Sequence, residues 1–193
     1  MVFFTAFLFS IVLSTQKVHA WQYETYNTRN IYGVTYQKYC PTYTLTSWQK
    51  RQINDELYRW NSSNGTGIYT PINITIGQNQ AQSIMDFYYY NNKSHGLGVA
   101  GNTDYVLGDR PVSFVYSNFS CATINAWGNV YNSLSNSKKI QFWAHETGHA
   151  MGLAHNDDLS YISVMRSSLY SNDYRNYDGP TANDLAGINH LYR

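Results

Sequence analysis

The stretch His145–His155, which reads HETGHAMGLAH, decides the fold of this chain. Residues four apart lie on the same face of a helix, one turn above each other. His145 and His149 can therefore both reach one metal ion. Glu146 is the next residue round the helix and can reach a water on that ion without being a ligand. The stretch thus predicts a helix that carries a metal site, with Glu146 as a general base.

The second half of this stretch supplies a turn and a third ligand. Gly152 follows the second histidine by three residues, and glycine tolerates a positive φ, so the helix can end there. The returning chain can then bring His155 to the same ion. Three imidazoles leave a fourth position open for water, as a catalytic zinc requires. We therefore expect one catalytic Zn2+, whereas isolated histidines such as His95 and His190 are interpreted as ordinary surface or core residues.

The first residues are typical of a secretory signal. Val2–Leu13 is almost wholly apolar, and Val18-His19-Ala20 places small residues at the −3 and −1 positions of a cleavage site. The apolar run is shorter than the roughly 20 residues of a transmembrane helix. We expect residues 1–20 to be removed and residues 21–193 to form one secreted, extracellular domain with no stable membrane association. The alternative is an uncleaved membrane anchor.

The net charge bears on the class of partner. Removal of the signal takes Lys17 with it and leaves equal numbers of basic and acidic residues, so the protein has no net positive charge that would attract nucleic acid.

Cys40 and Cys121 are the two cysteines of the chain. In an oxidising compartment they are expected to form one disulfide, and the alternative is two free buried thiols.

Hydrophobic periodicity predicts strands and one helix first, and then the helix that carries the metal site. A helix capped by Thr46 carries Ile53, Leu57 and Trp60 at helical spacing. From Ser137 the apolar period again becomes three and four, and after a loop a last helix begins at Pro180-Thr181. This order indicates an α+β single domain. Strands are predicted for residues 30–38, 70–76, 83–90, 111–116 and 122–126, with an edge strand after the glycine-rich loop 96–101.

The zinc-site pattern resembles that of a known family. HETGHAMGLAH is similar to the signature of the metzincin peptidases, and Met165 lies where these enzymes place a methionine-containing turn beneath the metal. The order of elements and the ending Pro180–Tyr192 are similar to the matrixin branch, peptidase family M10, in which Asp184 would support that turn. The resemblance implies a zincin-like domain with a twisted mixed β-sheet, an active-site helix and a C-terminal helix. It also implies structural roles for Gly152, Met165 and Asp184.

The chain also departs from the matrixin pattern. Cys40 lies in YCPT, which is not the matrixin cysteine switch, so we expect no zinc-blocking pro-domain. Only His95 lies in the region of the matrixin structural-zinc histidines, so no second zinc is expected, and calcium is left open. Ser167 stands where some metzincins have a tyrosine ligand. Tyr170 is a candidate for the wall of the substrate pocket.

These observations together predict a secreted zinc endopeptidase. A zinc-bound water would attack the peptide bond of a protein or peptide substrate, and the strand near Gly98–Gly101 would bind that substrate as an added strand. We expect a monomer. One alternative is a zinc-containing binding protein without turnover, against which the intact Glu146 argues. Another is a zinc hydrolase that acts on a non-peptide amide, such as cell-wall material.

Overall fold

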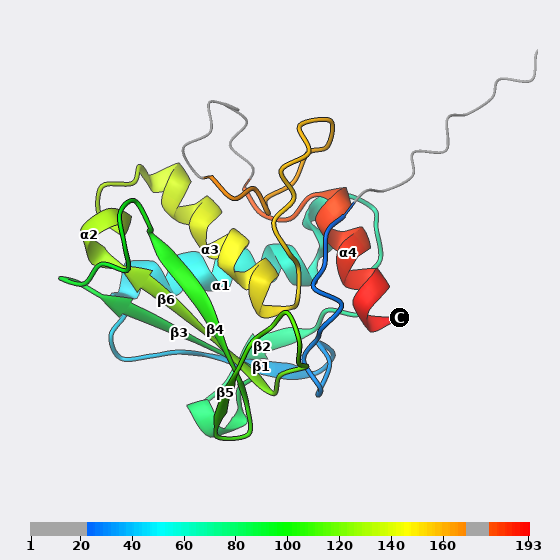
Figure 1. Cartoon of the computed structure of the whole chain (residues 1–193), viewed down its shortest axis with the longest axis horizontal. Coiled ribbons are helices and arrows are strands. Elements are labelled where there is room, and N and C mark those ends of the chain that lie inside the picture. The colour runs from blue at the N-terminus through cyan, green and yellow to red at the C-terminus, as the bar shows by residue number, and fades with distance from the viewer. Residues whose placement is uncertain (1–22, 169–177) are drawn as a thin grey trace, which may run out of the picture.

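A computed structural model describes residues 23–168 and 178–193 of the chain, so the expected signal and Tyr170 lie outside the described residues. Figure 1 shows a twisted sheet with its long helices on one face. In the part described, no helix is long and apolar enough to cross a membrane. The strands are β1 (Gln37–Pro41), β2 (Ile74–Ile76), β3 (Met85–Tyr90), β4 (Gly101–Leu107), β5 (Arg110–Val112) and β6 (Cys121–Trp127). The helices are α1 (Ser47–Asn61), α2 (Gly128–Tyr131), α3 (Asn136–Ala150) and α4 (Ala182–Tyr192), with short 3-10 turns η1 (Ser63–Gly65) and η2 (Gln80–Gln82).

The sheet is mixed, as predicted. Its strand order is β2-β1-β3-β6-β4-β5. The first four strands in this order are parallel, whereas β4 runs antiparallel to β6 and β5 runs antiparallel to β4. Strand β4 is therefore second from one edge of the sheet, and β5 pairs only with its C-terminal part, Tyr105–Leu107.

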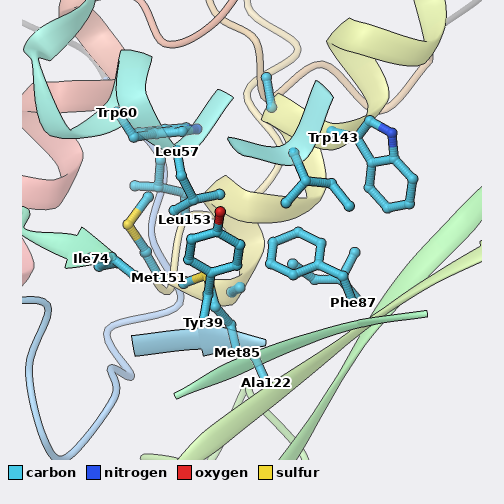
Figure 2. Packing of buried hydrophobic residues seen from close by; sticks show 14 of the residues in the cluster. Tyr39, Leu57, Trp60, Ile74, Met85, Phe87, Ala122, Trp143, Met151 and Leu153 are labelled. Atoms are coloured by element: carbon cyan, nitrogen blue, oxygen red, sulfur yellow. The ribbon is translucent and has the colours of Figure 1, made fainter. Parts of the chain in front are cut away.

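Side-chain alternation places the core between the sheet and the two long helices. Met85 and Phe87 of β3 and Ala122 of β6 are fully buried, because alternate residues of a strand point to the same face. Figure 2 shows Trp60 of α1 and Trp143 of α3 above this face of the sheet. The result is one continuous core, which fixes α3 against the sheet.

The helix predictions are confirmed, and their ends have clear local causes. Thr46 forms a capping box with Gln49: the Gln49 amide donates to the Thr46 hydroxyl at 3.2 Å, and the Thr46 amide donates to Gln49 Oε1 at 2.8 Å. Helix α4 begins with a second capping box, between Thr181 and Asp184. The short α2 was not predicted, since four residues carry too little periodicity.

Three predicted strands are shorter or shifted. The segment 30–38 was expected to be extended, but β1 begins only at Gln37 because Gly33 and Tyr36 adopt φ of 75° and 57°. The segment 70–76 forms a strand only over its last three residues. In 111–116 the strand ends at Val112, where a turn begins. The predictions for β3 and β6 are confirmed. Strand β4 follows the glycine-rich loop as expected, but it is second from the edge because β5 pairs with its C-terminal part.

The predicted disulfide is wrong, because Cys40 and Cys121 are free. Strand β3 lies between their strands: Cys40 is opposite Asp86, and Asp86 is opposite Thr123. Two strand spacings amount to about 10 Å, whereas a disulfide needs Cα atoms within about 7 Å. Burial raises the pKa of both thiols, that of Cys121 to about 12, so neither is a reactive thiolate near neutral pH.

Candidate metal centre

The end of α3 is shaped by a glycine turn. The Gly152 amide donates to His149 O at 2.8 Å, and the Leu153 amide donates to Gly148 O at 3.1 Å. This is the pair of bonds of a Schellman motif, which requires a left-handed residue after the cap. Gly152 has φ of 101°, and a Cβ on it would lie 2.5 Å from the carbonyl oxygen of Thr28. The position therefore needs glycine for its backbone conformation and for lack of space.

This turn brings three imidazoles together. His149 Nε2 lies 3.0 Å from His145 Nε2 and 3.1 Å from His155 Nε2. His145 Nδ1 lies 2.9 Å from Val164 O, and His149 Nδ1 lies 2.7 Å from Leu153 O. A carbonyl can only accept, so both Nδ1 atoms carry the proton and both Nε2 atoms present lone pairs to each other. Lone pairs at this distance call for a cation between them.

A zinc ion fits this donor set. Tetrahedral zinc with Zn–N bonds of about 2.05 Å would hold two nitrogens about 3.3 Å apart, close to the observed distances. Burial lowers the pKa of His145 to about 4 and that of His149 well below its usual value, so both rings are neutral and able to bind a metal. Among the described residues, these three histidines are the one group of this kind whose ligand atoms all lie within 4.8 Å of one another.

Glu146 is buried beside these rings. Its Oε2 accepts a hydrogen bond from the Thr103 hydroxyl at 2.8 Å, whereas Oε1 has no hydrogen-bond partner among the described residues. Burial raises the pKa of Glu146 to about 7, Asp104 raises it further, and the bond from Thr103 opposes the shift. A carboxylate with a pKa near neutrality is suited to accept and return a proton.

A turn around Met165 lies beneath the centre. The Met165 sulfur packs so closely under α3 that a Cβ on Gly148 would lie 2.3 Å from it. Asp184 holds the turn: its Oδ1 accepts from the Ser163 hydroxyl at 2.5 Å and its Oδ2 from the Val164 amide at 3.0 Å. Since Val164 O orients the ring of His145, the structure connects Asp184 to the metal centre through one residue.

The centre opens into a cavity of about 410 Å³. The stretch Gly98–Thr103 lines it together with the histidines and Glu146, and Ser167 also lines it. Tyr26 and Phe114 add an aromatic wall, with ring centroids 4.2 Å apart. The cavity therefore combines a metal-binding group, a buried carboxylate and a strand margin.

The sequence reasoning missed three contributors to this site. The segment Glu24–Tyr26 pairs with Gly152–Ala154, because the Ala154 amide donates to Glu24 O at 3.0 Å and the Tyr26 amide to Gly152 O at 3.3 Å. Thr103 reaches Glu146 from β4, and Phe114 comes from the loop after β5. No local pattern marks them, since each acts on residues far away in the sequence.

Comparison with known families agrees with this geometry. A reprolysin family model, described as Metallo-peptidase family M12, matches residues 2–183. The chain belongs to metallopeptidase family M12. A search of curated proteins found no match. This M12 metallopeptidase is a metzincin-type zinc metalloprotease, as expected from HETGHAMGLAH.

The matrixin branch predicted from the sequence is wrong, because the family is M12 and not M10. The choice of branch rested on the order of elements and on the Asp184 helix. Asp184 caps its own helix and supports the methionine turn. These two roles are structural, so the presence of Asp184 is poor evidence for one branch of the metzincins over another.

Proposed function

We propose that this M12 metallopeptidase is a secreted endopeptidase in which His145, His149 and His155 hold one catalytic zinc and Glu146 is the general base. The observation that carries the proposal is the buried Glu146 carboxylate beside three converging imidazoles in an open cavity. Neither a structural metal site nor a binding protein would require such a carboxylate.

The three histidines, Glu146 and Thr103 would have different roles in peptide hydrolysis. A zinc ion held by the three histidines would supply Lewis-acid polarisation of the scissile carbonyl and acidify a water. Glu146 takes a proton from the attacking water as the new C–O bond forms. It then gives this proton to the amine as the C–N bond breaks, so the carboxylate ends as it began. The hydrogen bond from Thr103 keeps Oε2 in place and leaves Oε1 for this proton.

The substrate backbone would pair with β4. Strand β5 covers only Tyr105–Leu107 of β4, so the stretch Gly101–Thr103, which lines the cavity, has an edge without a neighbour among the described strands. A peptide in extended conformation would add to this edge through main-chain hydrogen bonds. This mode of binding suits cleavage within a chain, because it does not depend on a free terminus.

The cellular setting belongs to the same proposal. The apolar start and the small residues before Trp21 support export with cleavage after Ala20. The near-neutral charge supports a partner that is a protein or peptide and not a nucleic acid. We propose that the enzyme acts outside the cell as a monomer.

One experiment tests the assignment against both alternatives. Wild-type enzyme and Glu146→Gln are incubated with casein, a proteome-derived peptide library and peptidoglycan, each with and without a zinc chelator. We expect chelator-sensitive cleavage of casein and internal cleavage of library peptides by the wild type. Glu146→Gln should retain one zinc per chain and lose at least a hundredfold in rate.

Three results would contradict the proposal. Full proteolysis by Glu146→Gln would remove Glu146 as the base. Cleavage of peptidoglycan alone would favour a hydrolase of non-peptide amides. Zinc binding by the wild type without cleavage of any substrate would favour a binding protein.

A further inference from the structure

Thr103 lies on the part of β4 that lines the cavity, and its side chain contacts the Glu146 carboxylate. Ala100 O, just before β4, accepts from the Trp127 amide, and Val106 O of β4 accepts from the Ser120 amide, both at 2.7 Å, so the even-numbered residues along this stretch bond toward β6. Successive peptide groups of a strand point to opposite edges. The N–H and C=O of Thr103 therefore point away from β6, toward the edge that borders the cavity.

The side chain of Thr103 points to α3 instead. Its hydroxyl lies 2.8 Å from Glu146 Oε2 and 3.2 Å from Glu146 O. A hydroxyl has one proton, and an ionised carboxylate is the stronger acceptor. The β-branched side chain has few rotamers, so the hydroxyl is held in this direction by the strand itself. The orientation of the carboxylate thus depends on the position of β4.

Packing of α3 against β4 does not require this bond. Two residues further along β4, the Tyr105 hydroxyl donates to the backbone oxygen of His149 at 2.9 Å and so holds the helix itself. Phe142 of α3 also fills the space over Gly101, where a Cβ would lie 2.3 Å from its ring. The hydroxyl of Thr103 instead contacts the Glu146 carboxylate, which is the proposed base.

We propose that Thr103 is a positioning residue, which couples the strand edge that receives the substrate backbone to the orientation of the Glu146 carboxylate. The inference rests on the proposed function, because it takes Glu146 as the base. A peptide paired with the Thr103 main chain fixes β4 in place. Through the side chain of the same residue it also fixes Oε2, and Oε1 is then presented to the attacking water.

The test compares two substitutions at this position. Thr103→Val removes the hydroxyl and keeps the shape, whereas Thr103→Ser keeps the hydroxyl and removes a methyl group. Thr123→Val is the matched control: Thr123 lies on the neighbouring strand β6, opposite Asp104, and faces away from α3. We measure kcat, KM, zinc content and the thermal midpoint for each variant.

We expect Thr103→Val to lower kcat about tenfold or more, as for loss of a hydrogen bond to a charged group, with KM changed less than twofold. Zinc content and the thermal midpoint should stay at wild-type values. Thr103→Ser should recover most of kcat, and Thr123→Val should match the wild type. In a Glu146→Gln background, Thr103→Val should leave the binding of an uncleaved peptide unchanged.

Several outcomes would overturn the inference. Wild-type kcat in Thr103→Val would mean that the bond does not position the base. Equal losses in the Val and Ser variants would assign the effect to the methyl group. A rise in KM with unchanged kcat would make Thr103 a substrate contact only. If Glu146→Gln itself retained activity, the proposed function would fail, whatever the Thr103 variants show.

Discussion

Replacement of Gly152 by alanine should damage the metal centre through its turn. Alanine at φ of 101° costs about 1–2 kcal/mol. Its Cβ would also lie 2.5 Å from Thr28 O, a backbone atom that can retreat only with its whole segment. Overpacking of this kind costs about 1–3 kcal/mol. We therefore expect Gly152→Ala to lower the free energy of unfolding by about 3 kcal/mol, which for a domain of this size lowers the thermal midpoint by about 6–12 °C.

The function of the centre should fall with its stability. The carbonyl that orients His149 belongs to Leu153, and His155 follows two residues later, so a displaced turn moves two ligands. We expect weaker zinc retention during dialysis against a chelator, together with a lower kcat/KM. Both can be measured alongside thermal unfolding on the same preparation.

Gly33→Ala separates the two causes. Gly33 has φ of 75° but nothing within 4 Å of a Cβ, so its substitution carries the backbone cost alone, about 1–2 kcal/mol. Gly33 lies outside the residues that line the cavity, so zinc retention should not change. If Gly152→Ala lost no more stability than Gly33→Ala and kept its zinc, the argument from the Thr28 contact would be refuted.

Two further predictions concern buried carboxylates. In Asp184→Asn an NH2 donor replaces one of the carboxylate oxygens that accept hydrogen bonds from Ser163, Val164 and Thr181. We expect the loss of this acceptor and of the charge to lower the free energy of unfolding in urea by about 2 kcal/mol and to weaken zinc retention. Wild-type stability would contradict the role of Asp184. Burial raises the pKa of Glu56 to about 7, so its contribution to stability is complete below about pH 4.5 and is lost as pH rises through 7. Glu56→Gln should therefore gain up to about 3 kcal/mol relative to wild type between pH 4.5 and pH 8, and a pH-independent difference in unfolding free energy would disprove this.

Local signals were sufficient to predict the helices and the clustering of the three histidines. Helix geometry alone is enough to interpret the spacing of His145 and His149 and the glycine three residues later. The structure brings these two histidines together with His155. The caps at Thr46 and Thr181 depend on residues three positions away. Such features can be predicted because cause and effect lie within one helical turn of the sequence.

Features that depend on distant residues were missed or mistaken. Nothing local to Cys40 reveals that β3 separates it from Cys121. The bond between Thr103 and Glu146 spans 43 positions and exists only because β4 packs on α3. The late start of β1 had a visible sign in Gly33, but Tyr36 gave none, since a tyrosine with positive φ is uncommon.

The carboxylate of Asp184 also limits how far the zinc motif can be moved. It accepts from the Thr181 amide that begins α4, and through Val164 it orients His145. A graft of the HETGHAMGLAH helix into another scaffold would carry the ligands but leave this brace behind. A designer would have to transplant the first turn of α4 as well, so the smallest portable unit of this metal centre is discontinuous in sequence.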